Sequence, residues 1–266
     1  MTRKKLDYDH YSISQIIEYS LCPKYYYYHR IEGRYVPPLY NMTAGKLVHA
    51  GLEEHNKEKV RGRQGLTAKQ ILEVAVAGLE QMEDASELDV PVAKAKDQLN
   101  LDGRPPVGRY LGVTERTFDE APVSEDDVER FAEFEFAGHK FVGYMDLVLP
   151  SRIVDYKLLG RRKSAKEVQV DPQLHLYSHV LGRPAGFVQL VKGREVADHT
   201  PQPQDERTAR GVLLWVEDMV RAIESSKQTG MFPRCSPAHW KCGKQCPFYP
   251  RCFRRKEAPD KTKSES

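Results

Sequence analysis

Two charged motifs near the middle of the chain, GYMD ending at Asp146 and DYK over Asp155–Lys157, have the residue types needed for metal-assisted hydrolysis. Both lie in apolar segments typical of β-strands. Side chains at i and i+2 share one strand face, so Asp155 and Lys157 project together, and Asp146 can join them from a paired strand. Two carboxylates and the Tyr156 backbone carbonyl would suit Mg²⁺ or Mn²⁺. The Lys157 ammonium would then position a hydroxide and offset phosphate charge.

An Asp-x-Lys pair by itself is more typical of a solvated strand face than of a catalytic site. Here the preceding residues Ile153 and Val154 are apolar, and a charged pair in such a strand needs a partner or a metal. His49 is a further candidate ligand, because Gly45, one helical turn earlier, leaves space for a metal or phosphate. A lone histidine on a helix is nevertheless more often structural.

Gln173 and Tyr177 lie four residues apart, on one face of a predicted helix. With them, four spaced pairs follow one another in a fixed order along the chain. This order resembles the RecB-like branch of the PD-(D/E)XK nuclease superfamily. The matching pairs are Gly45/His49, Gly143/Asp146, Asp155/Lys157 and Gln173/Tyr177.

The resemblance implies a restriction-endonuclease-like α/β core, with a mixed central sheet flanked by helices. In that family the histidine and two acidic residues hold a divalent metal, here His49, Asp146 and Asp155. The lysine activates the attacking water, and the glutamine and tyrosine contact DNA. The implied activity is a metal-dependent DNA exonuclease or end-processing nuclease that leaves a 3′-hydroxyl and a 5′-phosphate.

A short basic run, Arg161, Arg162 and Lys163, precedes the helix with Gln173 and is a second candidate DNA contact. The whole chain has 41 Lys+Arg and 38 Asp+Glu, giving a formal net charge of +3. This small excess does not by itself indicate nucleic-acid binding.

Four of the five cysteines lie near the C-terminus, and the fifth is Cys22. Such clustering in a reducing compartment favours metal binding over disulfides. One N-terminal and three C-terminal cysteines resemble the iron-sulfur subgroup that includes AddB-type helicase-nucleases and CRISPR-associated nucleases. The resemblance implies a [4Fe-4S] cluster on Cys22, Cys242, Cys246 and Cys252.

Four converging thiolates also suit a structural zinc ion, although the C-x3-C-x5-C spacing lacks the paired C-x2-C knuckles of common zinc ribbons. The subgroup pattern is C-x2-C-x5-C, so the first gap here has one extra residue. Cys235 is an additional thiol and an alternative ligand to Cys242.

The elements that must position these groups follow from capping and periodicity. Ser12 and Gln15 form a capping box ahead of a helix that continues into the Tyr25–Tyr28 run and carries Cys22. The tyrosines either pack around the thiols or form a base-stacking surface. A helix with His49 should begin near Asn41 or Thr43.

Further elements are expected downstream. Thr67 and Gln70 cap a helix. The predicted strands and helices after it are a hairpin around Ala137–Lys140, a strand over 151–159, a helix from Asp171-Pro172 to Gly182, a strand over 185–191 and a helix over 205–227.

The 266 residues suit one large domain with smaller parts. We expect an N-terminal helix segment over 1–34, a helical subdomain over 35–110 and a nuclease core over 111–230. A cysteine segment over 231–256 and a disordered tail over 257–266 follow. The lack of a long apolar run and of a signal peptide predicts a cytoplasmic protein without membrane contact.

The predicted substrate is single-stranded DNA or DNA ends, in recombination, repair or phage DNA metabolism. A helicase, recombinase or integrase partner is compatible with the sequence, as is a homo-oligomer. Two alternatives remain: a CRISPR-adaptation nuclease that trims fragments with an integrase, and a non-catalytic DNA-binding module with a structural cluster. Carboxylates that face phosphate would repel it, which counts against the binding module.

Overall fold

The computed structural model describes residues 9–34, 36, 40–84, 120–191, 197–201, 205–243 and 246–253. The chain divides into two compact units. One unit combines Met1–Val36 with Asp218–Ser266, and the other is Pro37–Glu217. The predicted tail over 257–266 and the stretch 85–119 of the predicted helical subdomain lie outside the described residues. The domain boundaries proposed from the sequence stay predictions.

A five-stranded mixed sheet forms the centre of the unit Pro37–Glu217, with strand order β1-β2-β3-β4-β5. Neighbouring strands are antiparallel except β3 and β4, which are parallel. The strands are β1 (Val128–Phe136), β2 (His139–Val148), β3 (Ile153–Leu159), β4 (Ala185–Val191) and β5 (Ala197–Pro201). The mixed α/β architecture predicted from the sequence is confirmed.

The hairpin between β1 and β2 turns at Ala137 and Gly138, as the sequence predicted. Both residues have positive φ, 53° and 73°, which matches the two-residue turn that follows the natural strand twist. β1 begins earlier than the expected start near Phe134. β5 was not predicted at all.

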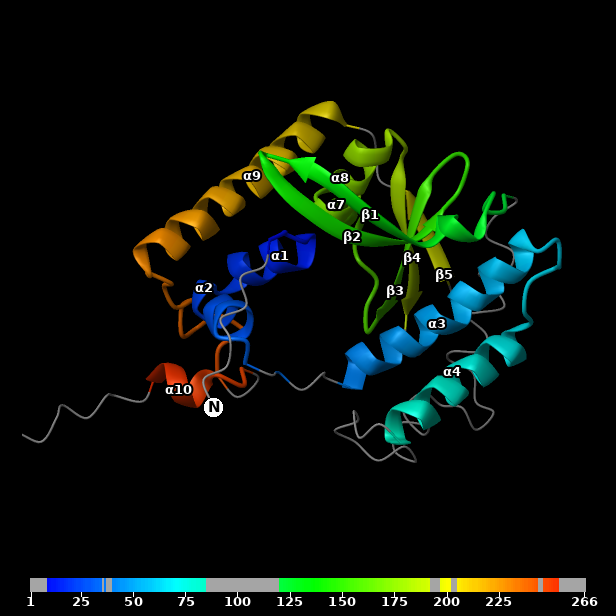
Figure 1. The fold of residues 1–266 in the computed structure, drawn as a ribbon, viewed down its shortest axis with the longest axis horizontal. Coiled ribbons are helices and arrows are strands. Elements are labelled where there is room, and N and C mark those ends of the chain that lie inside the picture. The colour runs from blue at the N-terminus through cyan, green and yellow to red at the C-terminus, as the bar shows by residue number, and fades with distance from the viewer. Residues whose placement is uncertain are drawn as a thin grey trace, which may run out of the picture. The chain divides into compact units, whose positions relative to one another are not determined.

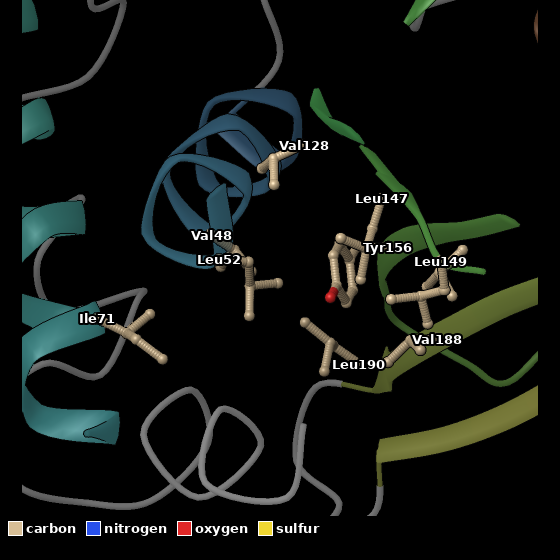
Figure 2. Packing of buried hydrophobic residues seen from close by; sticks show 10 residues of the cluster. Val48, Leu52, Ile71, Val128, Leu147, Leu149, Tyr156, Val188 and Leu190 are labelled. Carbon is tan, nitrogen blue, oxygen red and sulfur yellow. The ribbon is translucent and has the colours of Figure 1, made fainter. Parts of the chain in front are cut away.

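Helix α3 (Tyr40–Val60) lies against one face of the sheet, and α4 (Ala68–Asp84) packs against α3 on the side away from the strands (Figure 1). Val48 and Leu52 of α3 pack with Ile71 of α4 and with sheet residues that include Tyr156 and Leu190. Figure 2 shows the α3 side chains between Ile71 and the sheet. The predicted buried stripe of this helix is confirmed, and it presses α3 against the strands that carry the acidic motifs.

Helices α7 (Ala165–Gln169) and α8 (Pro172–Leu181) lie on the opposite face of the sheet (Figure 1). The side chain of Asp171 caps α8 by accepting a hydrogen bond from the Gln173 backbone N–H at 3.1 Å. Gly182 ends the helix in the left-handed conformation at φ 61°. Leu174 and Tyr177 then pack against Met145 and Phe187 of the sheet. Both predicted boundaries of this helix are confirmed.

The terminal segments form the other unit. It contains α1 (Ile13–Leu21), α2 (Pro23–Tyr26), the π-helical turn η1 (Tyr27–Ile31) and α10 (Tyr249–Phe253). The long helix α9 (Glu206–Thr229) begins in the sheet unit and ends in this one. Within the terminal unit Tyr19 donates to the Ala222 carbonyl at 3.1 Å, and its hydroxyl lies 2.8 Å from the Ser226 hydroxyl.

The first helix is shorter than predicted. Ser12 caps α1 as expected, with its side chain accepting from the Gln15 N–H at 3.4 Å. The expectation that Cys22 lies within this helix is wrong. Cys22 ends α1 in an extended conformation, because the proline at position 23 disfavours the helical conformation for the residue before it.

A short 3-10 turn, η2 (Glu125–Asp127), leads into β1. Among the helices in the described part of the chain, none is long and apolar enough to cross a membrane.

Candidate metal centre and active site

Three potential metal ligands meet where α3 faces the β1–β2 hairpin. His49 Nδ1 lies 3.4 Å from Asp146 Oδ1 and 3.7 Å from Glu129 Oε1. One ligand atom from each residue lies within 4.8 Å of the others, and no other such group of His, Cys, Asp and Glu occurs among the described residues. The predicted pair of His49 and Asp146 is thus brought together. Carboxylate oxygens and an imidazole nitrogen suit a divalent ion.

A buried ion pair adjoins this group on β3. Asp155 is 1% exposed, and its Oδ2 lies 2.6 Å from Lys157 Nζ without the alignment of a hydrogen bond. Its Oδ1 accepts from Gln173 Nε2 at 2.6 Å, and Gln173 Oε1 accepts from Lys157 Nζ at 3.2 Å. The predicted i, i+2 arrangement holds, and Gln173 locks both charged groups in place.

Two tyrosines hold the strands that carry these groups. The Tyr156 backbone N–H donates to Asp146 Oδ2 at 2.6 Å, which ties β3 to the acidic end of β2. The Tyr177 hydroxyl donates to the Tyr144 carbonyl at 2.7 Å. Tyr177 is 3% exposed, so in this structure it contacts the protein rather than solvent. The DNA-contacting roles of Gln173 and Tyr177 stay predictions.

Glycine at position 143 permits this approach of Tyr177. A Cβ at Gly143 would lie 3.0 Å from the Tyr177 hydroxyl oxygen and 3.1 Å from its ring. The GYMD motif therefore includes glycine because the α8 tyrosine packs directly on the strand. At Gly45, by contrast, a Cβ would meet nothing within 4 Å, which agrees with the open space predicted beside His49.

The charges at the site favour a cationic histidine and lysine. Burial lowers the pKa of His49, but hydrogen bonds to Asp146 and Glu129 outweigh it and raise the pKa to about 10. Burial likewise lowers the pKa of Lys157, and Asp155 reverses this to a net rise. Burial raises the pKa of Asp155, which Lys157 opposes. Lys157 is therefore an ammonium at neutral pH, able to donate hydrogen bonds and balance charge.

Glu129 was missed by the sequence analysis, which placed the start of the hairpin later. In a hairpin, residues equally far from the turn lie opposite each other, and Glu129 and Asp146 are equally far from the turn at Ala137 and Gly138. The sequence therefore contained a signal that would have placed Glu129 near Asp146. Glu129 also has a φ of 49°, an unusual conformation for a residue with a side chain. Such a backbone costs of order 1–3 kcal/mol and is found most often at functional sites.

The basic residues Arg161 and Lys163 pair with acidic residues outside the candidate metal site. Arg161 is exposed and pairs with Glu167 at 2.7 Å. Lys163 Nζ lies 2.7 Å from Asp171 Oδ2, and the Lys163 backbone N–H donates to the buried Gln189 side chain at 2.7 Å. Arg162 is exposed. DNA contacts by Arg161, Arg162 and Lys163 stay predictions.

All five cysteines line one pocket within the terminal unit. Cys22 and Cys252 are buried there beside Tyr25, Tyr28 and Phe248. This packing supports the interpretation of the tyrosine run as a cover for the thiols. The remaining cysteines in the pocket are Cys235, Cys242 and Cys246.

The thiols interact with one another, and Arg234 is a cation near Cys252. Burial raises the pKa of Cys235 to about 12, and hydrogen bonds and repulsion from Cys22 and Cys242 add to the effect. The pKa values of Cys246 and Cys252 are also raised, chiefly by burial. Cys235, the additional thiol of the sequence, therefore lies beside two of the expected ligands.

Residues 10–253 match the family model described as PD-(D/E)XK nuclease superfamily. The match spans most of the chain, which therefore belongs to this superfamily. Members use divalent metals, and the His49, Glu129 and Asp146 group is a suitable site for one. No curated protein matches the sequence.

Two solved structures are similar to the chain. A Eubacterium rectale protein named "putative exonuclease" has a TM-score of 0.54 and 14% identity, with 94% of this chain and 90% of that chain covered. At this identity the likeness shows the fold alone. The structure named SSO0001 is 16% identical, with 77% of this chain and 86% of that chain covered and a TM-score of 0.30.

Proposed function

We propose that this superfamily member is a metal-dependent deoxyribonuclease that processes DNA ends or single strands. The observation that carries the proposal is the approach of His49, Glu129 and Asp146 to within 4.8 Å, beside the Asp155–Lys157 pair. Asp155 adds a second buried carboxylate, and Lys157 adds a cation. This is the donor set that hydrolysis of a phosphodiester by a bound metal requires.

Mg²⁺ or Mn²⁺ at this position would polarise the scissile phosphate and lower the pKa of a bound water. We infer that His49, Glu129 and Asp146 hold the ion, with Asp155 and the Tyr156 backbone carbonyl as further donors. His49 must lose its proton to bind a metal, because only the neutral imidazole offers a lone pair. Asp146 is kept in place for this role by the Tyr156 N–H.

Lys157 acts in this scheme as a hydrogen-bond donor. Its raised pKa keeps it protonated, so it orients the attacking oxygen and stabilises charge on the phosphate rather than removing a proton. Gln173 fixes the ammonium through its Oε1 and fixes Asp155 through its Nε2. We assign Gln173 as a positioning residue for this pair.

End-labelled single-stranded and duplex DNA, incubated with Mn²⁺ or Mg²⁺, tests the proposal. Wild type should cleave only with metal, and Asp155→Ala should lose cleavage while keeping or improving DNA binding. Asp218→Ala is a matched control, because Asp218 is an exposed carboxylate paired only with Arg221 among the described contacts. The label pattern gives the polarity of degradation and shows whether internal sites are cut.

Failure of a folded wild type to cleave any of these substrates would contradict the nuclease proposal. DNA binding without cleavage would then favour the non-catalytic binding module. Activity restored only by an integrase would favour trimming in CRISPR adaptation, and activity restored by a helicase or recombinase would favour end processing in recombination or repair.

We also propose that the thiol pocket holds a [4Fe-4S] cluster. Cys22, Cys242, Cys246 and Cys252 line one pocket, in which Cys22 and Cys252 are buried, and four converging thiolates suit a metal cluster. A single zinc ion with Zn–S bonds of about 2.3 Å would bring four sulfurs to within about 4 Å of one another. No three described cysteines reach 4.8 Å mutual spacing, so a larger cluster is the better fit.

Anaerobic purification with iron, sulfide and zinc analysis tests the cluster. We expect iron and inorganic sulfide with a brown visible absorption, lost in Cys22→Ser. Zinc without iron would contradict the cluster and support the structural zinc alternative.

A further inference from the structure

Two exposed aromatic side chains face each other on the β1–β2 hairpin. Phe131 is 51% exposed and Tyr144 is 59% exposed, and their ring centroids lie 5.3 Å apart at an interplanar angle of 53°. They are direct partners across the antiparallel ladder. Single exposed aromatics are ordinary on protein surfaces, so the position of this pair is what matters.

The aromatic pair shares a hairpin face with the acidic residues of the site. Tyr144 and Asp146 are i and i+2 on β2, and Phe131 is the cross-strand partner of Tyr144. Glu129, two residues before Phe131 on β1, lies beside His49, as Asp146 does. Met145, which precedes Asp146, packs instead on the opposite face against Tyr177. Two residues along a strand span about 6.8 Å, so the rings begin about one nucleotide away from the metal ligands.

The backbone of Tyr144 is held by helix α8. The Tyr144 backbone carbonyl accepts the 2.7 Å hydrogen bond from the hydroxyl of Tyr177, and α8 also carries Gln173. Gln173 in turn binds Asp155 and Lys157. The aromatic surface and the catalytic pair are therefore held by one helix, and a surface ordered in advance loses little entropy on binding.

The next position along this face limits how far a ligand can extend over it. Glu133 follows Phe131 at i+2, and it pairs with Lys140 at 2.9 Å. Glu135 follows at the next such position and is opposite Lys140. Beyond the two rings the face carries these charged residues and the half-buried Val142 opposite Glu133, so the exposed aromatic surface has room for about one base.

We propose that Phe131 and Tyr144 bind one unpaired nucleobase next to the scissile phosphate, which gives the site a preference for single-stranded DNA. Aromatic side chains stack on any base, so the contact is independent of sequence. A base within a duplex already stacks on its neighbours and does not offer a free face. The proposal rests on the nuclease function proposed above.

Single-stranded and blunt duplex oligonucleotides with one 2-aminopurine test the proposal, with Ca²⁺ for binding and Mn²⁺ for cleavage. Wild type should quench the fluorophore on the single strand, and Phe131→Ala/Tyr144→Ala should abolish the quenching. Stacking energies of aromatic contacts correspond to a roughly 10-fold to 100-fold rise in Kd and KM for single strands. The value of kcat should change far less.

Three controls separate stacking from other effects. Tyr144→Phe retains the ring and should behave as wild type. Phe131→Leu/Tyr144→Leu retains apolar bulk without an aromatic face and should lose the quenching, which also covers the case in which the alanine variant fails to fold. Leu214→Ala removes an exposed apolar side chain elsewhere, on α9, and should have no effect.

Wild-type affinity and quenching in the folded double variant, with metal-dependent cleavage intact, would overturn the stacking proposal and leave the nuclease function standing. Equal weakening of single-stranded and blunt duplex binding would also overturn it, since the ligand would then not be an unpaired base. If wild type neither binds nor cleaves either substrate, the proposed function itself fails.

Discussion

The carboxylate site and the thiol pocket differ in how their charges are balanced without a metal. Asp155 and Asp146 have the basic side chains of Lys157 and His49 within 2.6 Å and 3.4 Å, so each carboxylate has a group of opposite charge beside it. In the thiol pocket, burial and the neighbouring thiols instead raise the pKa values of Cys235, Cys246 and Cys252, and that of Cys235 reaches about 12. The first site is arranged before metal arrives, whereas the second needs a metal to stabilise its thiolates.

This difference implies different consequences of metal loss. Removal of a divalent ion from the carboxylate site leaves a set of internal ion pairs, so the sheet unit should persist. Removal of a metal from the thiol pocket leaves uncompensated, poorly bonded thiols between segments far apart in the sequence. The stability of the terminal unit should therefore depend on its metal.

The largest expected effect tests the carboxylate site. Asp146→Asn removes the charge of a candidate ligand while keeping its shape, so kcat/KM should fall by about 1000-fold, or about 4 kcal/mol. Thermal unfolding without metal should stay close to that of wild type. Retention of cleavage in this variant, with Asp218→Asn as the exposed control, would show that the site does not carry the reaction.

Loss of a thiol ligand should destabilise the terminal unit without removing divalent-ion binding by the sheet unit. For Cys22→Ser we expect a loss of at least about 3 kcal/mol in the stability of that unit, because a structural metal contributes its binding energy to folding. Limited proteolysis and thermal unfolding measure the first effect, and Mn²⁺ titration measures the second.

Cys235→Ser is the matched control for this comparison. If Cys242 is the ligand, Cys235→Ser should retain the metal and Cys242→Ser should lose it. The reverse result would transfer the ligand role to Cys235, which lies beside both Cys22 and Cys242.

A pH-dependent effect of intermediate size should arise in the sheet unit from His55. This side chain is 2% exposed, and its Nδ1 lies 2.9 Å from the Leu66 carbonyl oxygen and 3.0 Å from the Leu66 N–H. Burial, followed by repulsion from Lys59, lowers its pKa from 6.5 to about 4.

Because the folded pKa of His55 is lower than the unfolded one, its neutral form stabilises the protein fully above pH 6.5. As the pH falls from 6.5 to 4 the unfolded chain gains a proton that the folded chain does not, and about 3 kcal/mol is lost. His55→Gln should flatten this part of the stability curve measured by denaturant unfolding. An unchanged slope, with His179→Gln as the exposed control in the same unit, would contradict the assignment.

The smallest expected effects are losses of stability on removing one helix N-cap in each unit. Ser12 in the terminal unit and Thr67 in the sheet unit each accept a hydrogen bond at 3.4 Å from the backbone N–H three residues on. Alanine at either position should cost about 1 kcal/mol. In calorimetry, two transitions that respond separately would show independent units, and one shared transition would show that they unfold together.

Local signals in the sequence predicted much of the fold. Asp171-Pro172 and Gly182 marked both ends of α8, and the apolar run over 185–191 matched β4 residue for residue. Such boundaries depend on capping and backbone preferences within a few residues. β5 was missed because its pairing with β4, rather than its own composition, makes it a strand.

The shared strand face of Asp155 and Lys157 could be predicted from the sequence, because the alternation of side chains along a strand is a local property. The place of Glu129 in the metal site could not be predicted in the same way. Its approach to Asp146 depends on the length of β1 and on a left-handed backbone at Glu129. Gln173 was expected to contact DNA, and only the packing of α8 on the sheet showed its bonds to Asp155 and Lys157.

The sequence by itself determined the chemical groups and their order: histidine, two aspartates, a lysine, an amide and five thiols. The tertiary structure alone decided which groups meet. It added Glu129 to the metal site, placed Cys235 beside the other thiols, and put two aromatic rings on the face of the acidic residues. The physical reason is that spacing along the chain sets local geometry, whereas contacts between distant segments depend on packing of the whole unit.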